Sequence, residues 1–125
     1  MLDDLAPPEV VRKQSVTVVA PGPDYENIYE NMLGNFNSLL DVASTIQPPL
    51  LVVDLAHTKL IGSAFLGFLL RLSNRVAGRE GGRFGVCNLA PFCQSVFRTT
   101  RLDKIWELFD SRAEAVAAFS TGEST

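Results

Sequence analysis

Asp54, His57 and Ser63 are the residue types of a hydrolase triad, and they lie close together in the chain. A triad works through its geometry, however, and closeness along the sequence says little about geometry. The serine stands in G-S-A-F, which lacks the G-x-S-x-G turn that presents a nucleophilic serine above a sheet. His57 falls in a loop after a predicted strand, where a histidine is more often a surface residue than a base. We therefore expect a protein that is not an enzyme.

Asp54 also ends an apolar run, as does the phosphorylated aspartate of a receiver domain. Such a site holds magnesium, and a hard cation of this kind favours several oxygen ligands. Asp3 and Asp4 lie well before the first predicted strand and cannot supply them, and Lys104 is followed by Ile105 rather than by proline. We interpret Asp54 instead as a strand-end residue that hydrogen-bonds the next loop.

The sequence carries no motif for a metal or a cofactor. Cys87 and Cys93 do not have the C-x-x-C spacing of a redox or zinc motif, and His57 is the only histidine. The glycine-rich stretch 78–82 is not followed by the G-K-[ST] of a phosphate-binding loop. We expect two reduced thiols in a cytoplasmic protein, with no cofactor and no metal.

Charge and hydropathy argue against two further classes of protein. The 125 residues include 11 Lys and Arg against 14 Asp and Glu, a formal net charge of -3, whereas proteins that bind nucleic acid are usually basic. The longest apolar stretch, 64–70, is far shorter than the roughly 20 residues of a membrane-spanning helix. The acidic N-terminus also lacks the basic and apolar regions of a secretory signal. We expect neither nucleic-acid binding nor a membrane span.

The elements that position these residues alternate between strand and helix patterns. Apolar β-branched runs predict strands, and apolar spacings of three and four predict helices. The strands are predicted over 16–20, 50–55, 83–88 and 105–109, and the helices over 24–43, 63–77, 91–100 and 111–119. This order predicts an α/β sandwich with a mostly parallel central sheet of about four to five strands and about four helices. Residues 1–15 are expected to form a flexible leader, 16–119 a single domain, and 120–125 a polar tail.

The predicted helix over 63–77 positions the candidate residues for a binding function. Ser63 is a favourable N-cap residue, so its hydroxyl is expected to be exposed beside unpaired amides that favour a phosphate. Arg71, Arg75 and Arg79 share one stripe, which is either a solvated face or a contact for an acidic partner. Phe68 falls near this polar side and is a candidate interface anchor.

The chain from Leu50 to Phe119 resembles a STAS domain, the fold of bacterial anti-sigma factor antagonists. L-V-V-D-L resembles the family's strand ending in Asp-Leu, and I-G-S-A-F-L-G-F-L-L stands in place of D-S-S-G-L-G-x-L-L. C-N-L-A-P-F-C-Q-S-V-F resembles the segment N-x-S-P-x-V-x-x-x-L, and R-L-D-K-I-W-E-L-F-D-S-R-A-E-A resembles the family's closing stretch. The family's early G-x-L-D turn is replaced by P-G-P-D-Y. The resemblance implies a STAS-like sandwich.

The resemblance also implies a regulatory module that binds a protein partner and has no catalytic residues. In this family a partner kinase, often the anti-sigma factor itself, phosphorylates a serine that matches Ser63 here. Phosphorylation would then control whether the sigma factor is released. The partner-binding residues that the resemblance implies are Gly62, Ala64, Phe65, Leu66 and Phe68.

Three positions depart from the family pattern, and they leave alternatives open. Gly62 stands where the family has Asp, Ala64 replaces a second Ser, and Phe65 replaces Gly. The missing Asp favours an alternative, in which the chain is the STAS subunit of a lipid-transporting ABC system and binds its ATPase without phosphorylation. Phe65 and Phe68 are equally candidates for a homodimer contact. Ligand binding near the same loop has no convergent polar set in the sequence to support it.

Overall fold

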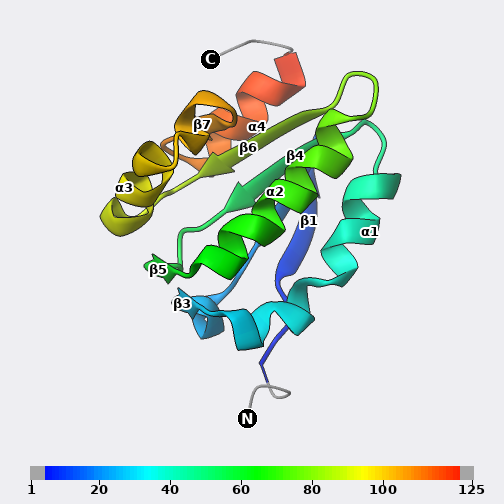
Figure 1. Ribbon diagram of the computed structural model, residues 1–125. Helices are drawn as coiled ribbons and strands as arrows, with labels where there is room; N and C mark the ends of the chain where they lie inside the picture. The colour runs from blue at the N-terminus through cyan, green and yellow to red at the C-terminus, as the bar shows by residue number, and fades with distance from the viewer. Residues whose placement is uncertain (1–4, 122–125) are drawn as a thin grey trace.

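A five-stranded sheet with helices on both faces forms the centre of the protein, as the computed structural model, which describes residues 5–121, shows (Figure 1). Its strands lie in the order β1-β2-β4-β6-β7. Their bounds are β1 (Glu9–Lys13), β2 (Val16–Ala20), β4 (Leu50–Asp54), β6 (Arg83–Cys87) and β7 (Glu107–Phe109). Only the pairing of β1 with β2 is antiparallel. The predicted α/β fold with a mostly parallel sheet is confirmed.

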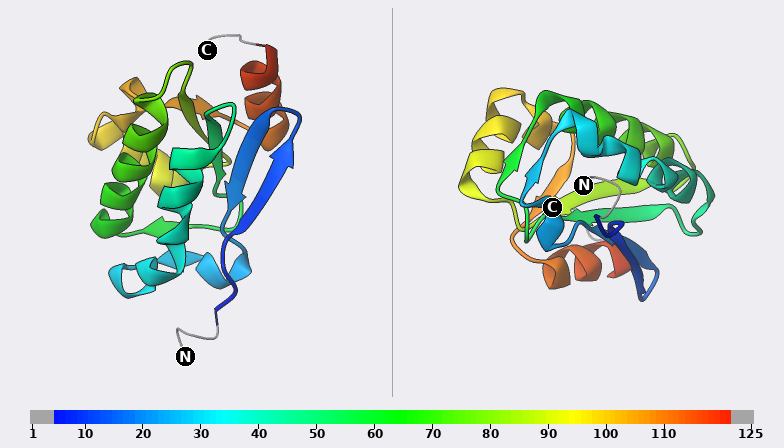
Figure 2. Two further views of the ribbon diagram at one scale, coloured as in Figure 1. Left: turned by 90° about the vertical axis from the view of Figure 1, so that its right-hand side faces the viewer. Right: turned by 90° about the horizontal axis from the view of Figure 1, so that it is seen from below.

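Helices cover the two faces of the sheet unequally. α1 (Ser38–Thr45) and α2 (Ser63–Ala77) lie on one face, and α4 (Arg112–Thr121) lies on the other (Figure 2). α3 (Pro91–Thr99) contributes Cys93 and Phe97 to the same core cluster as α1 and α2. The sheet is therefore buried on both faces, which explains why its central strands are apolar throughout.

Alternate residues of the central strands supply two separate cores. In β4, Leu51 and Val53 face the larger cluster under α1 and α2, whereas Leu50 and Val52 face the smaller cluster under α4. The two-residue period of a strand produces this division. All five residues of β4 are buried, so this strand contributes side chains to both cores.

β1 corrects the prediction of a flexible leader over 1–15. Glu9–Lys13 pairs with β2 along its whole length, and the hairpin turns through Gln14, whose φ of 57° lies in the left-handed region. Ala6 is also held, because its carbonyl accepts a hydrogen bond of 2.6 Å from the Tyr25 hydroxyl. Val11 packs against the core under α4, and this contact holds the strand to the domain. Residues 1–4 of the predicted leader lie outside the described residues.

The helix predicted over 24–43 is divided in the structure. Two 3-10 segments, Pro23–Tyr25 and Glu30–Phe36, flank the two-residue strand β3 (Asn27–Ile28), and α1 follows. Most of the apolar residues that gave the helical spacing are nevertheless buried together, as Ile28, Met32, Phe36, Leu39 and Ala43, and Leu40 is partly buried against them. The pattern identified the buried side of the segment and not its backbone conformation, because spacings of three also fit a 3-10 helix.

The remaining predicted elements differ only at their ends. The final strand is shortened, because the 3-10 segment Leu102–Lys104 occupies the chain just before it. Ser111 caps the last helix, because its hydroxyl accepts a hydrogen bond of 3.1 Å from the Glu114 amide. α4 then extends to Thr121, so the first part of the predicted polar tail is helical, and residues 122–125 lie outside the described residues.

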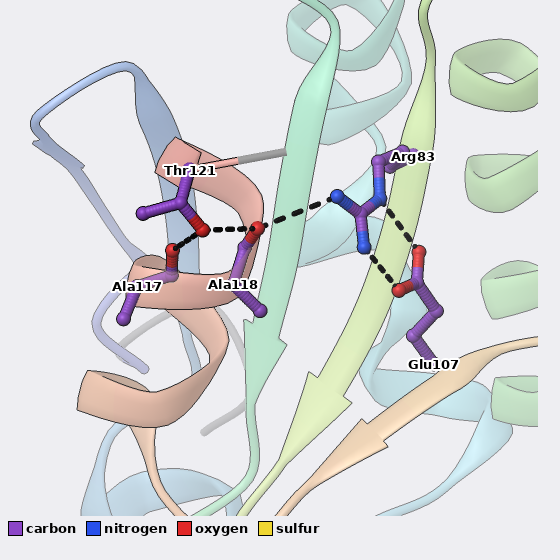
Figure 3. Close-up of polar contacts among 5 residues, drawn as sticks. All are labelled: Arg83, Glu107, Ala117, Ala118 and Thr121. Atoms are coloured by element: carbon purple, nitrogen blue, oxygen red, sulfur yellow. Dashed lines mark hydrogen bonds and ion pairs between the residues drawn. The ribbon is translucent and has the colours of Figure 1, made fainter. Parts of the chain in front are cut away.

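Arg83 joins three elements at one end of the sheet (Figure 3). Its Nε donates a 2.9 Å hydrogen bond to Glu107 of β7, and a second guanidinium nitrogen also contacts that carboxylate. Its Nη1 donates to the carbonyl of Ala118 in α4 at 3.4 Å, and the guanidinium lies 4.4 Å from the centre of the Phe119 ring. Bidentate and stacked contacts of this kind need arginine rather than lysine.

Trp106 lies in an aromatic cluster just before β7. Its side chain is buried, and its ring meets Phe84 and Phe97 edge-on, with centroid separations of 5.2 and 5.5 Å. These rings join β6, α3 and the start of β7. Trp106 therefore belongs to the hydrophobic core.

Candidate partner-binding surface

Ser63 is exposed at the first residue of α2, and this position corrects one expectation. The N-cap residue is Gly62, in extended conformation, and no side chain caps this end of the helix. The Ser63 hydroxyl is therefore free of the capping role expected for it. Its own amide and that of Ala64 begin the first helical turn, where backbone amides have no partner within the helix.

A short ribbon of two strands fixes Ser63 in place. β5 (Leu60–Ile61) pairs in parallel with β3, and the Gly62 amide donates a 2.9 Å hydrogen bond to the Ile28 carbonyl. The Glu26 carbonyl accepts from the amides of Lys59 and Leu60 at 2.7 and 3.1 Å. The loop leading to Ser63 is thus tied by its backbone to a distant segment of the chain.

Apolar side chains are exposed around Ser63, and sequence reasoning found only one of them. Tyr29 follows the residue that binds Gly62 and is 50% exposed, and Leu60 of β5 is 40% exposed. On α2, Leu66 is half-buried and Leu70 is 39% exposed, one and two turns beyond Ser63. We call Tyr29, Leu60, Ser63, Leu66 and Leu70 the docking surface. Exposed apolar groups on the ribbon that leads to Ser63 and on the helix that begins there are candidates for a protein contact.

Phe65 and Phe68 correct the prediction of aromatic interface anchors. Both side chains are 1% exposed, and both rings meet Phe36 edge-on, at centroid separations of 5.7 and 5.8 Å. The buried face of α2 is wide because three parts of the protein pack against this helix: α1, the 3-10 segment Glu30–Phe36 and the sheet. In this conformation neither ring can contact a partner or a second copy, and the outward residues are Leu66 and Leu70.

The arginine stripe of α2 is largely occupied by contacts within the chain. The Arg75 guanidinium donates to the Leu40 carbonyl at 3.4 Å and to the Ser44 hydroxyl at 3.2 Å. Arg79 donates to the Ala43 carbonyl at 3.3 Å. Arg75 therefore joins α2 to α1, and Arg79 joins the turn after α2 to α1. These contacts favour a structural role over a surface for an acidic partner.

Asp54 has the strand-end role interpreted from the sequence. Its carboxylate accepts hydrogen bonds of 3.0 Å from the Ala56 amide and from Asn88, and of 2.8 Å from Arg112. Burial by itself would raise the pKa of Asp54, but these hydrogen bonds and the Arg112 charge outweigh burial and lower the pKa below its ordinary value. The carboxylate joins β4, the residue that follows β6, and α4, and its hydrogen bonds come from neither His57 nor Ser63 of the triad considered above.

The two cysteines are free and buried. Burial, and to a smaller extent the Asp54 charge, raises the pKa of the Cys87 thiol to about 12. Cys87 is therefore protonated at neutral pH and is a poor nucleophile.

In the part of the chain that the structure describes, no three His, Cys, Asp or Glu side chains come together in a way that could hold a metal ion. Within residues 5–121, none of the helices combines the length and the apolar character that crossing a membrane requires.

Comparison with known proteins gives matches in structure alone. No family model and no curated protein matches the sequence. An anti-sigma-factor antagonist (STAS) domain protein from Planctomyces limnophilus is similar with a TM-score of 0.87 and 25% identity, over 92% of this chain and 99% of that one. An anti-sigma factor antagonist from Mycobacterium paratuberculosis is similar with a TM-score of 0.77 and 26% identity, over 90% and 92%. A structure from Thermotoga maritima, at 18% identity, shares the fold with a TM-score of 0.70, over 90% and 93%.

Proposed function

We propose that this chain, which shares the fold of anti-sigma factor antagonist (STAS) domain proteins, binds an anti-sigma factor of the serine-kinase type. The partner contacts the docking surface at the start of α2. The observation that carries this proposal is the exposure of Ser63 among Tyr29, Leu60 and Leu70. Apolar area of this kind gives affinity when a partner covers it.

Phosphorylation of Ser63 is proposed as the switch that ends binding. A phosphate adds roughly -1.5 to -2 charges, and the free amides of the first turn of α2 stabilise it within the chain. The same charge must lose water when an apolar partner surface covers it, which is costly. Phosphorylation therefore leaves the fold intact and disfavours the complex.

Paired variants of Ser63 test the switch. Tagged wild type, Ser63→Ala and Ser63→Asp are used to capture partners from the host, and binding to the purified partner is then measured by calorimetry. We expect Ser63→Ala to bind like wild type and Ser63→Asp to bind at least roughly ten-fold more weakly, which corresponds to about 1.4 kcal/mol. Ser38→Asp is the matched control, because Ser38 is also exposed at the first residue of a helix.

Incubation of the purified partner with ATP completes the test. Mass spectrometry is expected to find one added phosphate on the wild type and none on Ser63→Ala. Equal affinity of Ser63→Ala and Ser63→Asp would contradict the switch.

Gly62 leaves the α2 N-terminus without the carboxylate of the family pattern, and this supports the second candidate, a STAS subunit of a lipid-transporting ABC system. Retention of the same transporter ATPase by all forms would establish that function instead.

A further inference from the structure

A cleft of about 560 Å³ opens at the carboxyl ends of β4, β6 and β7. Residues that follow each of these strands line it, among them Ala56, Asn88 and Asp110. α3 and the loop before β5 form the other walls, through Gln94 and Lys59. In open α/β sheets the carboxyl ends of the strands are where ligands bind, and the volume lies within the range of small-molecule sites.

The charged side chains of the cleft are mostly without partners. Among the described residues, the side chains of Arg98, Asp103 and Asp110 make no hydrogen bond or ion pair, although all three line the cleft. Lys59 is the fourth charged residue of the lining and has one contact, a 3.4 Å ion pair with Glu26. The lining therefore presents two positive and two negative groups, and its formal charges cancel.

Amide side chains and an apolar wall complete the cleft. The Asn88 amide is oriented by its 3.0 Å hydrogen bond to Asp54, and the Gln94 amide by its 2.9 Å hydrogen bond to the Leu89 carbonyl. Leu108 and Phe109 supply partly buried apolar surface. Oriented polar groups beside apolar surface are the ordinary make-up of a specific small-molecule site.

We propose that this cleft binds a small zwitterion of the free amino acid class. A simple anion would meet the Asp103 and Asp110 carboxylates, and a simple cation would meet Lys59 and Arg98, so neither is favoured by the lining as a whole. A net-neutral molecule with a carboxylate and an ammonium group can pair with both signs. Such charge-assisted hydrogen bonds are stronger than neutral ones. The cleft shares no lining residue with the docking surface, and this proposal does not depend on the proposed function.

A matched set of probes tests the proposal by nuclear magnetic resonance. ¹H–¹⁵N spectra of the full chain are titrated with L-glutamine, then with the analogue that lacks its α-amino group and the analogue that lacks its carboxylate. We expect L-glutamine to shift the amide signals of Asn88, Gln94 and Asp110. Each analogue is expected to bind roughly ten-fold more weakly, because a charge-assisted contact is lost.

Two variants assign the binding to the cleft. Arg98→Gln and Asp110→Asn are each expected to weaken L-glutamine binding by roughly ten-fold, and Arg71→Gln, an exposed arginine outside the cleft, is expected to leave it unchanged. The same spectra report whether each variant is folded. Partner capture through the docking surface should be unaffected by Arg98→Gln, so the two proposals fail independently. No shift in the cleft signals, or equal affinity for all three probes, would overturn the proposal.

Discussion

Asp54 shows how much one buried carboxylate contributes to this fold. It is 4% exposed and receives its three hydrogen bonds from the following loop, from Asn88 just after β6 and from Arg112 of α4. Its pKa is lowered in the folded state, so folding favours the charged form. The contribution of the charged carboxylate to the free energy of unfolding is present above the ordinary pKa of an aspartate, about 3.9. It is lost as the pH falls through the lower pKa that Asp54 has in the folded protein.

Substitution of Asp54 is therefore expected to change stability in a pH-dependent way. At pH 7, Asp54→Asn should lower the free energy of unfolding by about 2 kcal/mol, because hydrogen bonds to a charged group are lost. The loss relative to wild type should shrink below about pH 4. Urea denaturation from pH 2 to pH 7 measures this. Asp41→Asn, at an exposed position of α1, is the control, and a loss for Asp54→Asn that is independent of pH would contradict the argument.

Single residues also show where sequence reasoning fails. The strand-end role of Asp54 was predictable, because a lone carboxylate after a buried run needs nearby donors. The burial of Phe68 was not predictable, since its partner Phe36 comes from a segment far away in the chain. Tyr29 and Leu60 were missed because neither belongs to a run long enough to have a period.

At the scale of elements, the start of α2 is held by backbone contacts without a capping side chain. Gly62 has φ -91° and ψ 169°, which any residue adopts. A Cβ built there would lie 3.6 Å from the Ile28 carbonyl oxygen, an ordinary contact. The position can therefore accept the Asp of the family pattern.

Gly62→Asp is accordingly expected to stabilise the protein. Its carboxylate can accept from free amides of the first turn of α2 and lies at the positive end of the helix dipole. We expect the free energy of unfolding to rise by about 0.5 kcal/mol, with a smaller gain at high salt. Thermal unfolding at two salt concentrations measures it. Gly62→Ala adds the Cβ without the capping oxygen and should not stabilise, so an equal gain in both variants would disprove the capping argument.

The bounds of elements were predictable where composition changes abruptly. The apolar run of β4 and the glycines after α2 fix those bounds to within a residue. β3 and β5 have two residues each and could not be predicted, because their pairing depends on the tertiary fold. The segment between the strand predicted over 50–55 and the helix predicted over 63–77 therefore contains part of the ribbon that positions Ser63.

At the scale of the whole molecule, Phe36 joins the segment before α1 to the core of α2. It is 1% exposed, and its ring contacts Tyr25, Phe65 and Phe68 edge-on. Phe36→Ala should lower the free energy of unfolding by about 4 kcal/mol, through lost burial and the cavity left behind. Urea denaturation followed by far-ultraviolet circular dichroism measures the loss. Phe92→Ala, at a position 48% exposed, should cost far less, and similar losses for both would contradict this view of the core.

The cleft could not be predicted from the sequence, because its lining comes from distant parts of the chain. Its charged residues come from positions 59, 98, 103 and 110, which the sequence separates and the sheet brings together at one edge. The order of strands, and not any local pattern, decides which loops meet. A convergent polar set was therefore absent from the sequence and is present in the fold.

The single tryptophan gives the protein a built-in optical reporter. Trp106 is enclosed by Phe84 and Phe97, and none of these rings belongs to the docking surface. We therefore expect its emission to follow the packing of α3 against the sheet, to shift to longer wavelength when that packing is lost, and to be unchanged by modification of Ser63. A variant that loses its partner while its emission spectrum is unchanged has lost a surface, whereas one whose spectrum shifts has lost its fold.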